Sequence, residues 1–157
     1  MAARYSDSDI DSFLHEPKRL PQDYLTRMRL KNKRGHKEQE LDITGDNGNQ
    51  FRLILRQSNS NAFDFSVILV VCPKETNLVF RLRRYNGRSH EHTNLIEGDT
   101  FYDFHVHKAT ERYQDLGTRE DAFAERTDGY SDYHKAMQRM LADCGFVLPK
   151  ENQLPML

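Results

Sequence analysis

The chain has 157 residues, of which 37% are hydrophobic and 30% charged, and its formal net charge is −1. This length suits a single domain, but the mean hydropathy of −0.83 leaves only a thin core. The composition excludes a membrane-spanning protein and a secretion signal, because the longest apolar run, Val67–Cys72, is far shorter than the roughly 20 residues of a span and the first residues have no apolar segment.

The number of cysteines and the distribution of charge limit further which class of protein this is. Cys72 and Cys144 form neither a disulfide framework nor a zinc-finger spacing, so we expect a cytoplasmic protein with reduced thiols. Residues 1–88 carry a net positive charge and residues 89–157 a net negative charge. This asymmetry indicates either a polyanionic partner or two halves that attract each other.

The N-terminal part predicts a helix followed by a hairpin. Ser6–His15 begins with a residue that can cap a helix, has acidic residues in its first turn, and is followed by Pro17. Thr26–Lys33 alternates cations with apolar residues, which is typical of a half-buried strand. An Arg-Gly dipeptide would turn this strand into a second one, Lys37–Thr44.

A two-residue turn sets the register of this hairpin. Each cation then faces a carboxylate, in the pairs Lys31 with Glu38, Arg29 with Glu40 and Arg27 with Asp42. A bare row of cations would predict a nucleic-acid interface. Because carboxylates oppose this row, we favour a solvated cross-strand ladder, worth about 0.2–1 kcal/mol per pair.

The next three strands are expected to form the middle of the sheet. A three-residue loop with Gly48 at positive φ keeps Ile43 opposite Phe51, which a two-residue turn would not do. Strand Gln50–Gln57 follows that loop. Phe63–Cys72 is apolar on both faces after its second residue, which predicts a central strand covered by a helix.

Two later strands are predicted by alternation alone. Leu78–Tyr85 would place Leu78, Phe80 and Leu82 inward, with Val79, Arg81, Arg83 and Tyr85 on the opposite face. Thr100–Lys108 would place Tyr102, Phe104 and Val106 in the core, with Phe101, Asp103, His105 and His107 on the other face. The polar segment between these strands, residues 86–99, is interpreted as a loop or a partial hairpin.

The C-terminal part predicts a helix and a tail. Ala122–Glu125 is a candidate short strand, and Ser131–Cys144 has an apolar stripe of helical period that ends before Gly145. The predicted fold is therefore α+β. A mainly antiparallel meander of five or six strands would pack against this helix and a short N-terminal helix, with residues 1–146 as one domain and 147–157 as a tail.

Four of the seven histidines gather in two His-x-His pairs, His90 with His92 and His105 with His107. Spacing of two on a strand places His105 and His107 on one face, about 7 Å apart. Tight hairpins at Asn86-Gly87 and at Gly98-Asp99 would bring all four onto that face. Together with Arg81, Arg83, Tyr85 and Asp103 they would form an exposed surface that can hold a phosphate and move a proton near neutral pH.

This surface has several interpretations. His105 and His107 could act as general acid and base, with Arg81 and Arg83 on the phosphate. The two His-x-His pairs could instead supply ligands to a divalent metal such as zinc. Because the segment around His90 and His92 is polar on both faces, these two could lie in a mobile loop. The face could also be an ordinary solvated sheet surface.

The segment Leu82–His107 resembles a small family of uncharacterised prokaryotic proteins of unknown function. The resemblance rests on Leu82, Asn86, Gly87, His90, Gly98, His105 and His107, which match an LRL..NG..H segment, a glycine-containing loop and a strand ending in H.HIY. Lys108 and Ala109 depart from that pattern. The resemblance implies an association with prophage or other mobile regions and no transferable activity.

Two functions follow as hypotheses. The first is a domain directed at nucleic acid or another phosphodiester, nuclease- or toxin-like, that uses the Arg/His face. The second is a non-enzymatic interaction domain from a mobile element or defence locus, which would pair, for example as a homodimer, through an exposed strand or through its oppositely charged halves. The pI of about 6.7 argues against strong non-specific binding to RNA or DNA.

Overall fold

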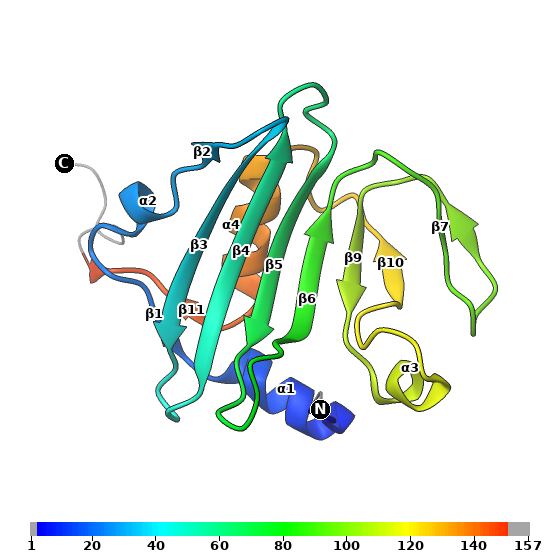
Figure 1. The fold of residues 1–157 in the computed structure, drawn as a ribbon, viewed down its shortest axis with the longest axis horizontal. Helices are drawn as coiled ribbons and strands as arrows, with labels where there is room; N and C mark the ends of the chain where they lie inside the picture. The colour runs from blue at the N-terminus through cyan, green and yellow to red at the C-terminus, as the bar shows by residue number, and fades with distance from the viewer. Residues whose placement is uncertain (1–2, 151–157) are drawn as a thin grey trace.

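The computed structural model describes residues 3–150 and confirms the α+β class (Figure 1). A seven-stranded antiparallel sheet has the order β10-β9-β6-β5-β4-β3-β2, two strands more than the lower expectation. Its strands are β2 (Lys31–Asn32), β3 (His36–Thr44), β4 (Gln50–Ser58), β5 (Phe65–Val71), β6 (Phe80–Asn86), β9 (His105–Lys108) and β10 (Ala124–Arg126). Smaller elements are α1 (Asp7–His15), β1 (Lys18–Arg19), α2 (Tyr24–Arg27), β7 (His92–Thr93), β8 (Thr100–Phe101), α3 (Glu111–Leu116), α4 (Tyr133–Asp143) and β11 (Phe146–Val147).

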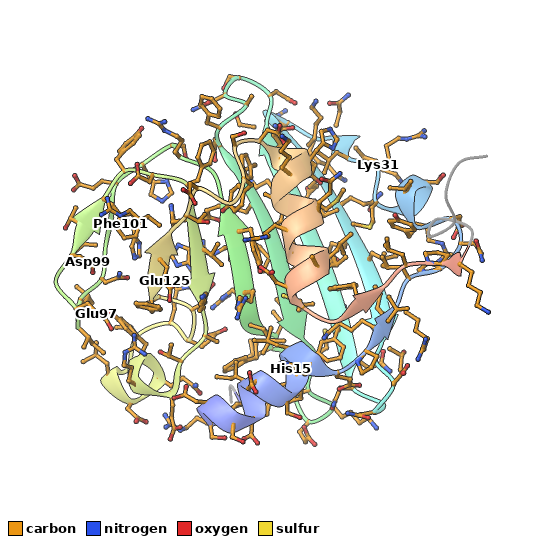
Figure 2. All side chains as sticks on the ribbon, turned by 180° about the vertical axis from the view of Figure 1, so that it is seen from behind. His15, Lys31, Glu97, Asp99, Phe101 and Glu125 are labelled. Carbon is orange, nitrogen blue, oxygen red and sulfur yellow. The ribbon has the colours of Figure 1, made fainter. Side chains whose placement is uncertain are left out.

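One face of the sheet is covered by α4, as Figure 2 shows from behind. Asp132 caps this helix, and its stripe of Ala136, Met140 and Cys144 is fully buried. The stripe packs on the inward residues of the central strands, such as Leu55 on β4, which is also fully buried. Burial of apolar surface, which stabilises by about 25 cal/mol per Å², therefore holds the helix against the sheet. This is the packing that the apolar stripe of the sequence predicted.

The predicted helix at the N-terminus is confirmed and is fixed by a buried lysine. Ser6 and Asp9 form a capping box at the start of α1. Beyond its end, the Lys18 ammonium is buried and donates to the carbonyl oxygens of Phe13 at 2.7 Å, Glu16 at 2.8 Å and Cys144 at 2.8 Å. It thus satisfies carbonyls at the C-terminal ends of both α1 and α4, where a cation is favourable.

The two hairpins predicted near the N-terminus are confirmed only in part. The three-residue loop is confirmed, because Ile43 pairs with Phe51 and Gly48 has φ 88°. Lys31 pairs with Glu38 as predicted. The strand predicted over 26–33 is wrong in its first half, where the chain forms α2. Arg27 accordingly bonds to Asp23 at 2.9 Å, four residues earlier in the chain, and not to a cross-strand carboxylate.

An extra residue in β6 changes the faces predicted for this strand. Leu69 of β5 pairs with Arg83, whereas Val70 pairs with Arg81, so Leu82 is one residue too many on β6. Such a bulge reverses the alternation of side chains beyond it. Tyr85 therefore lies in the core under α4, and Arg83 donates to its hydroxyl at 3.3 Å. Leu78, expected inward, is 52% exposed.

The strand predicted over 100–108 is divided in two. Thr100–Phe101 pairs with β7 in a separate hairpin, and only His105–Lys108 joins the main sheet, between β6 and β10. Tyr102, expected in the core, is 50% exposed for this reason. The β7–β8 hairpin lies at the β10 end of the sheet (Figure 1).

The predicted boundary after residue 146 falls inside a strand. β11 pairs in parallel with β1, with Val147 opposite Arg19. Gly145, at φ 78°, ends α4 as expected and lets the chain turn toward this pairing. The rest of the predicted tail, residues 151–157, lies outside the described residues.

Replacing the buried lysine should destabilise the whole fold. In Lys18→Met the carbonyl groups at two helix ends lose their donor, and we expect the free energy of unfolding to fall by about 2–4 kcal/mol. Urea unfolding followed by circular dichroism measures this loss. Lys74→Met, at an exposed position, is the matched control, and equal stability of the two variants would contradict the role assigned to Lys18.

The same lysine predicts a pH dependence. Burial lowers the pKa of Lys18 from 10.5 to about 8, so between these values the unfolded chain binds more protons than the folded one. Stability contributed by this group then rises from about pH 8 toward pH 10. The difference in unfolding free energy between wild type and Lys18→Met should grow over that interval, and a constant difference would contradict it.

Candidate metal centre

Three histidines from two different elements converge on one point. One ring nitrogen from each of His92, His105 and His107 lies within 4.8 Å of the other two. The ring centroids are 4.9 Å apart for His92 and His107, 5.0 Å for His105 and His107, and 5.5 Å for His92 and His105. The sequence brought these residues together in the predicted site, and the structure confirms that they are neighbours.

The sheet fixes two of the three rings. His105 and His107 alternate on β9, which pairs with β6 on one side and with β10 on the other. His105 lies opposite Asn86 and His107 opposite Arg84 on β6. Both histidines are buried, because the β7–β8 hairpin covers this face. The prediction that these histidines belong to an exposed Arg/His surface is therefore wrong, because both are buried.

Backbone carbonyl groups select the tautomer of these two imidazoles. The Nδ1 of His105 lies 2.7 Å from the carbonyl oxygen of Asp103, and the Nδ1 of His107 lies 2.7 Å from that of Asp121. A carbonyl oxygen can only accept, so each Nδ1 carries the proton and donates it. Each Nε2 is left with a free lone pair, and the Nε2 of His105 is buried without a partner among the described residues.

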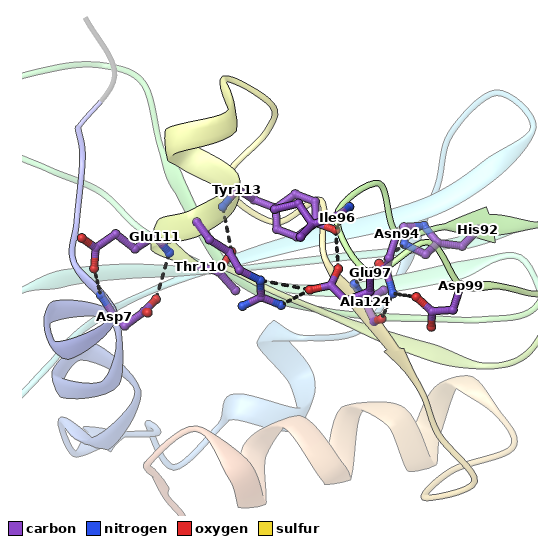
Figure 3. A network of polar contacts seen from close by, with 11 residues as sticks. Asp7, His92, Asn94, Ile96, Glu97, Asp99, Thr110, Glu111, Tyr113 and Ala124 are labelled. Atoms are coloured by element: carbon purple, nitrogen blue, oxygen red, sulfur yellow. Dashed lines mark hydrogen bonds and ion pairs between the residues drawn. The ribbon is translucent and has the colours of Figure 1, made fainter.

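An asparagine selects the tautomer of the third imidazole (Figure 3). The side chain of Asn94 accepts from the N–H of Ala124 at 2.9 Å and donates to the carbonyl oxygen of Ala124 at 2.7 Å, which fixes its amide orientation. Its Oδ1 lies 2.8 Å from Nε2 of His92. Nε2 of His92 must therefore donate, and Nδ1 holds the lone pair.

Further polar contacts hold the hairpin that carries His92 against the rest of the domain. At its tip, Glu97 accepts from the hydroxyl of Tyr113 at 2.6 Å and from Arg112 (Figure 3). The Tyr113 hydroxyl in turn accepts from the N–H of Ile96 at 3.0 Å. The hairpin is thus attached to α3 at one end and, through Asn94, to β10, so His92 is held close to the sheet.

Burial keeps the two sheet histidines neutral. Desolvation lowers the pKa of His105 from 6.5 to about 4 and that of His107 to about 2. Arg84, across the ladder from His107, lowers the latter further by its positive charge. A metal-free general acid must hold a proton near neutral pH, so the buried positions of His105 and His107 do not favour the acid–base pair that the sequence predicted.

Three arginines surround a buried carboxylate next to this cluster. Asp121 is fully buried, and its carboxylate lies 3.1 Å from Nε of Arg84, 3.4 Å from Nε of Arg81 and 3.6 Å from Nε of Arg119. Its backbone carbonyl is the group that holds His107. One residue therefore connects the arginines to the histidine cluster.

The remaining predicted site residues are divided between two faces. Arg81 lies on the histidine side and also bonds to Glu120. Arg83 and Tyr85 lie on the α4 side because of the bulge in β6, so the common face predicted for them is wrong. His90 is exposed, with its ring centroid 5.9 Å from that of His105. The Asp103 carboxylate pairs with Arg126 at 3.5 Å, away from the cluster.

Sequence reasoning did not identify Asn94, Asp121 or Arg84 as parts of the site. Asn94 follows His92 by two residues, a spacing that could have indicated a supporting hydrogen bond. Asp121 gave no such signal, because it is far along the chain from His107 and meets it only through β10 and the loop before that strand. Unbroken alternation along β6 would place Arg84 on the face opposite to Arg81, so the sequence pattern does not indicate it.

No protein-family model, curated protein or solved structure matches the chain. Among the described residues, every helix is too short or too polar to cross a membrane. The site must therefore be interpreted from its own geometry.

Removing the Asn94 amide should loosen the hairpin. In Asn94→Ala the backbone N–H and carbonyl of Ala124 lose their partner, and we expect a loss of about 1–3 kcal/mol in unfolding free energy. Hydrogen exchange at the amide of Ala124 should accelerate by more than the exchange elsewhere in the sheet. Asn77→Ala, at an exposed position, is the control. Unchanged exchange at Ala124 in Asn94→Ala would contradict the attachment of the hairpin through Asn94.

Proposed function

We propose that this domain binds one transition-metal ion, zinc by ligand type, through His92, His105 and His107. The observation that supports it is the convergence of three imidazole rings whose N–H groups are each donated to a fixed oxygen. Histidine ligands in metal sites show this arrangement, since the second nitrogen is held by a carbonyl or carboxylate while the first binds the ion.

The spacing of the nitrogen atoms suits such an ion. Ligands around tetrahedral zinc at about 2.0–2.1 Å lie about 3.3 Å from one another. The present separations, up to 4.8 Å, exceed that value by at most about 1.5 Å, so the three rings would have to move closer together when an ion binds. Imidazole nitrogens without a nearby carboxylate ligand favour zinc, copper or nickel over magnesium or calcium.

Three protein ligands leave one coordination position for another group. Catalytic zinc sites have this count and keep water in the fourth position, whereas structural sites are closed by a fourth side chain. His90 is a further donor in the neighbourhood, with its ring centroid 5.9 Å from that of His105. The exposed ring of His90 would either complete a closed site or assist a metal-bound water.

Metal-dependent action on a phosphodiester is the second candidate, and the arginine group supports it. Arg81, Arg84 and Arg119 share the single carboxylate of Asp121, with Glu120 adjacent to Arg81. A net positive charge next to a metal-bound water would attract a phosphate and stabilise charge that develops on it. Arg119 is the most exposed of the three and would contact the substrate first.

Metal binding should depend on the buried histidines. We expect about one zinc per chain after dialysis, and removal of one ligand in His105→Ala should weaken affinity at least 100-fold. Competition with a chromophoric chelator measures the dissociation constant, and elemental analysis measures the content. His134→Ala, an exposed histidine on α4, should bind like wild type. Equal affinity in His105→Ala would overturn the proposed centre.

Catalysis is tested separately from binding. The zinc-loaded protein is incubated with a short RNA, a short DNA and an activated phosphodiester, with Arg119→Gln as the partner variant. Cleavage that disappears with a chelator and falls about tenfold or more in Arg119→Gln would support the second candidate. Metal binding without cleavage would support the alternative to an enzyme, an interaction domain that the metal stabilises. Analytical sedimentation would then test whether the domain self-associates as a homodimer.

A further inference from the structure

We propose that a second site, on the face of the sheet opposite the histidines, binds a phosphoryl group. It is a cavity of about 160 Å³ lined by residues of β6, β9, β10 and α4. Figure 2 shows α4 over the central strands on this face, with Glu125 labelled on β10 at the side of the sheet. The site shares no side chain with the proposed metal centre and does not depend on it.

The key residue of this site is Arg83, a mostly buried guanidinium with incomplete hydrogen bonding. One of its terminal nitrogens donates to the hydroxyl of Tyr85 at 3.3 Å, and that hydroxyl donates to Asp143 at 2.8 Å. Its Nε is buried without a partner, and within residues 3–150 it forms no ion pair with a carboxylate. A buried cation that lacks a direct counter-charge favours an anion beside it.

Three further cations reach the same cavity from different elements. Lys108 lies directly opposite Arg83 on β9, and Arg126 and Arg139 come from β10 and α4. Two carboxylates line the cavity with them, those of Glu125 and Asp143. The lining thus holds four cations and two carboxylates, an excess of two positive charges, or of one when the exposed Asp103 beside Arg126 is included.

The existing ion pairs leave these cations free to bind a ligand. Lys108 is 3.2 Å from Glu125, and Arg139 is 3.9 Å from Asp143 with about half of its side chain exposed. Exposed pairs of this kind contribute little and exchange partners readily. A phosphate can accept bidentate hydrogen bonds from the arginines, which a chloride ion cannot.

The volume of the cavity favours a terminal phosphate over the continuous backbone of a nucleic acid. A phosphomonoester carries close to two negative charges at neutral pH, and the positive excess of the lining attracts it. The phosphate could be free or could be the end of a nucleotide or oligonucleotide. These sources share the same recognition chemistry and are separated by experiment.

The test compares binding in wild type, Arg83→Gln and Arg52→Gln. Arg52 lies on the other face of the sheet and pairs with Asp42, so it controls for loss of one positive charge. Inorganic phosphate, a 5′-phosphorylated dinucleotide and the same dinucleotide without phosphate are titrated by calorimetry at constant ionic strength. We expect saturable binding of phosphorylated probes only, and a dissociation constant raised at least about tenfold in Arg83→Gln alone.

The outcomes separate this site from the histidine cluster. If Arg83→Gln does not fold, as judged by circular dichroism, Lys108→Gln replaces it and should weaken phosphate binding in the same direction. Tighter binding of the phosphorylated dinucleotide than of phosphate would identify a nucleotide end as the ligand. No saturable binding by wild type, equal binding in Arg83→Gln, or binding that His105→Ala abolishes would overturn the proposal.

Discussion

The candidate site depends on the backbone pairing of β9 between β6 and β10. This pairing places His105 and His107 on one face at fixed spacing, and the β7–β8 hairpin buries both. It also brings the carbonyl of Asp121, in the loop before β10, to the ring of His107. A ring whose protonated nitrogen is held by a rigid main-chain acceptor has little freedom to rotate. The orientation of the Nε2 atoms of His105 and His107 is therefore set by main-chain acceptors that the strand pairing positions.

The single extra residue in β6 separates two kinds of chemistry. On one side of the strand, Arg81 and Arg84 converge on Asp121 next to neutral histidines. On the other side, Arg83 lies under α4 with Tyr85 and lines a cavity that other cationic side chains also line. Without the bulge, alternation would put Arg81 and Arg83 together and leave Arg84 on the helix side. The domain therefore has two distinct polar regions, a histidine cluster on one face of the sheet and a cation-lined cavity on the other.

The hairpin β7–β8 adds the third ligand and controls how buried the site is. Within residues 3–150 it pairs with no strand of the main sheet, and side chains hold it, chiefly those of Asn94 and Glu97. Side-chain attachments of this kind open more easily than a sheet ladder. A metal bound by His92 as well as by β9 would join this hairpin to the sheet, so metal binding and ordering of residues 89–101 are expected to be coupled.

The sequence by itself determined the elements that local chemistry specifies. The capping serine of α1, the glycine loop before Phe51, the apolar central strand and the stripe of α4 each follow from spacing and turn residues, and each is present. It also indicated that His92, His105 and His107 belong together. Only the tertiary structure decided that these rings are buried, which nitrogens are free, and on which face Arg83 and Arg84 lie. The physical reason is that these features arise from pairing between segments distant in the sequence: the bulge, the covering hairpin and an acceptor more than ten residues away. Periodicity within one segment does not indicate such pairing.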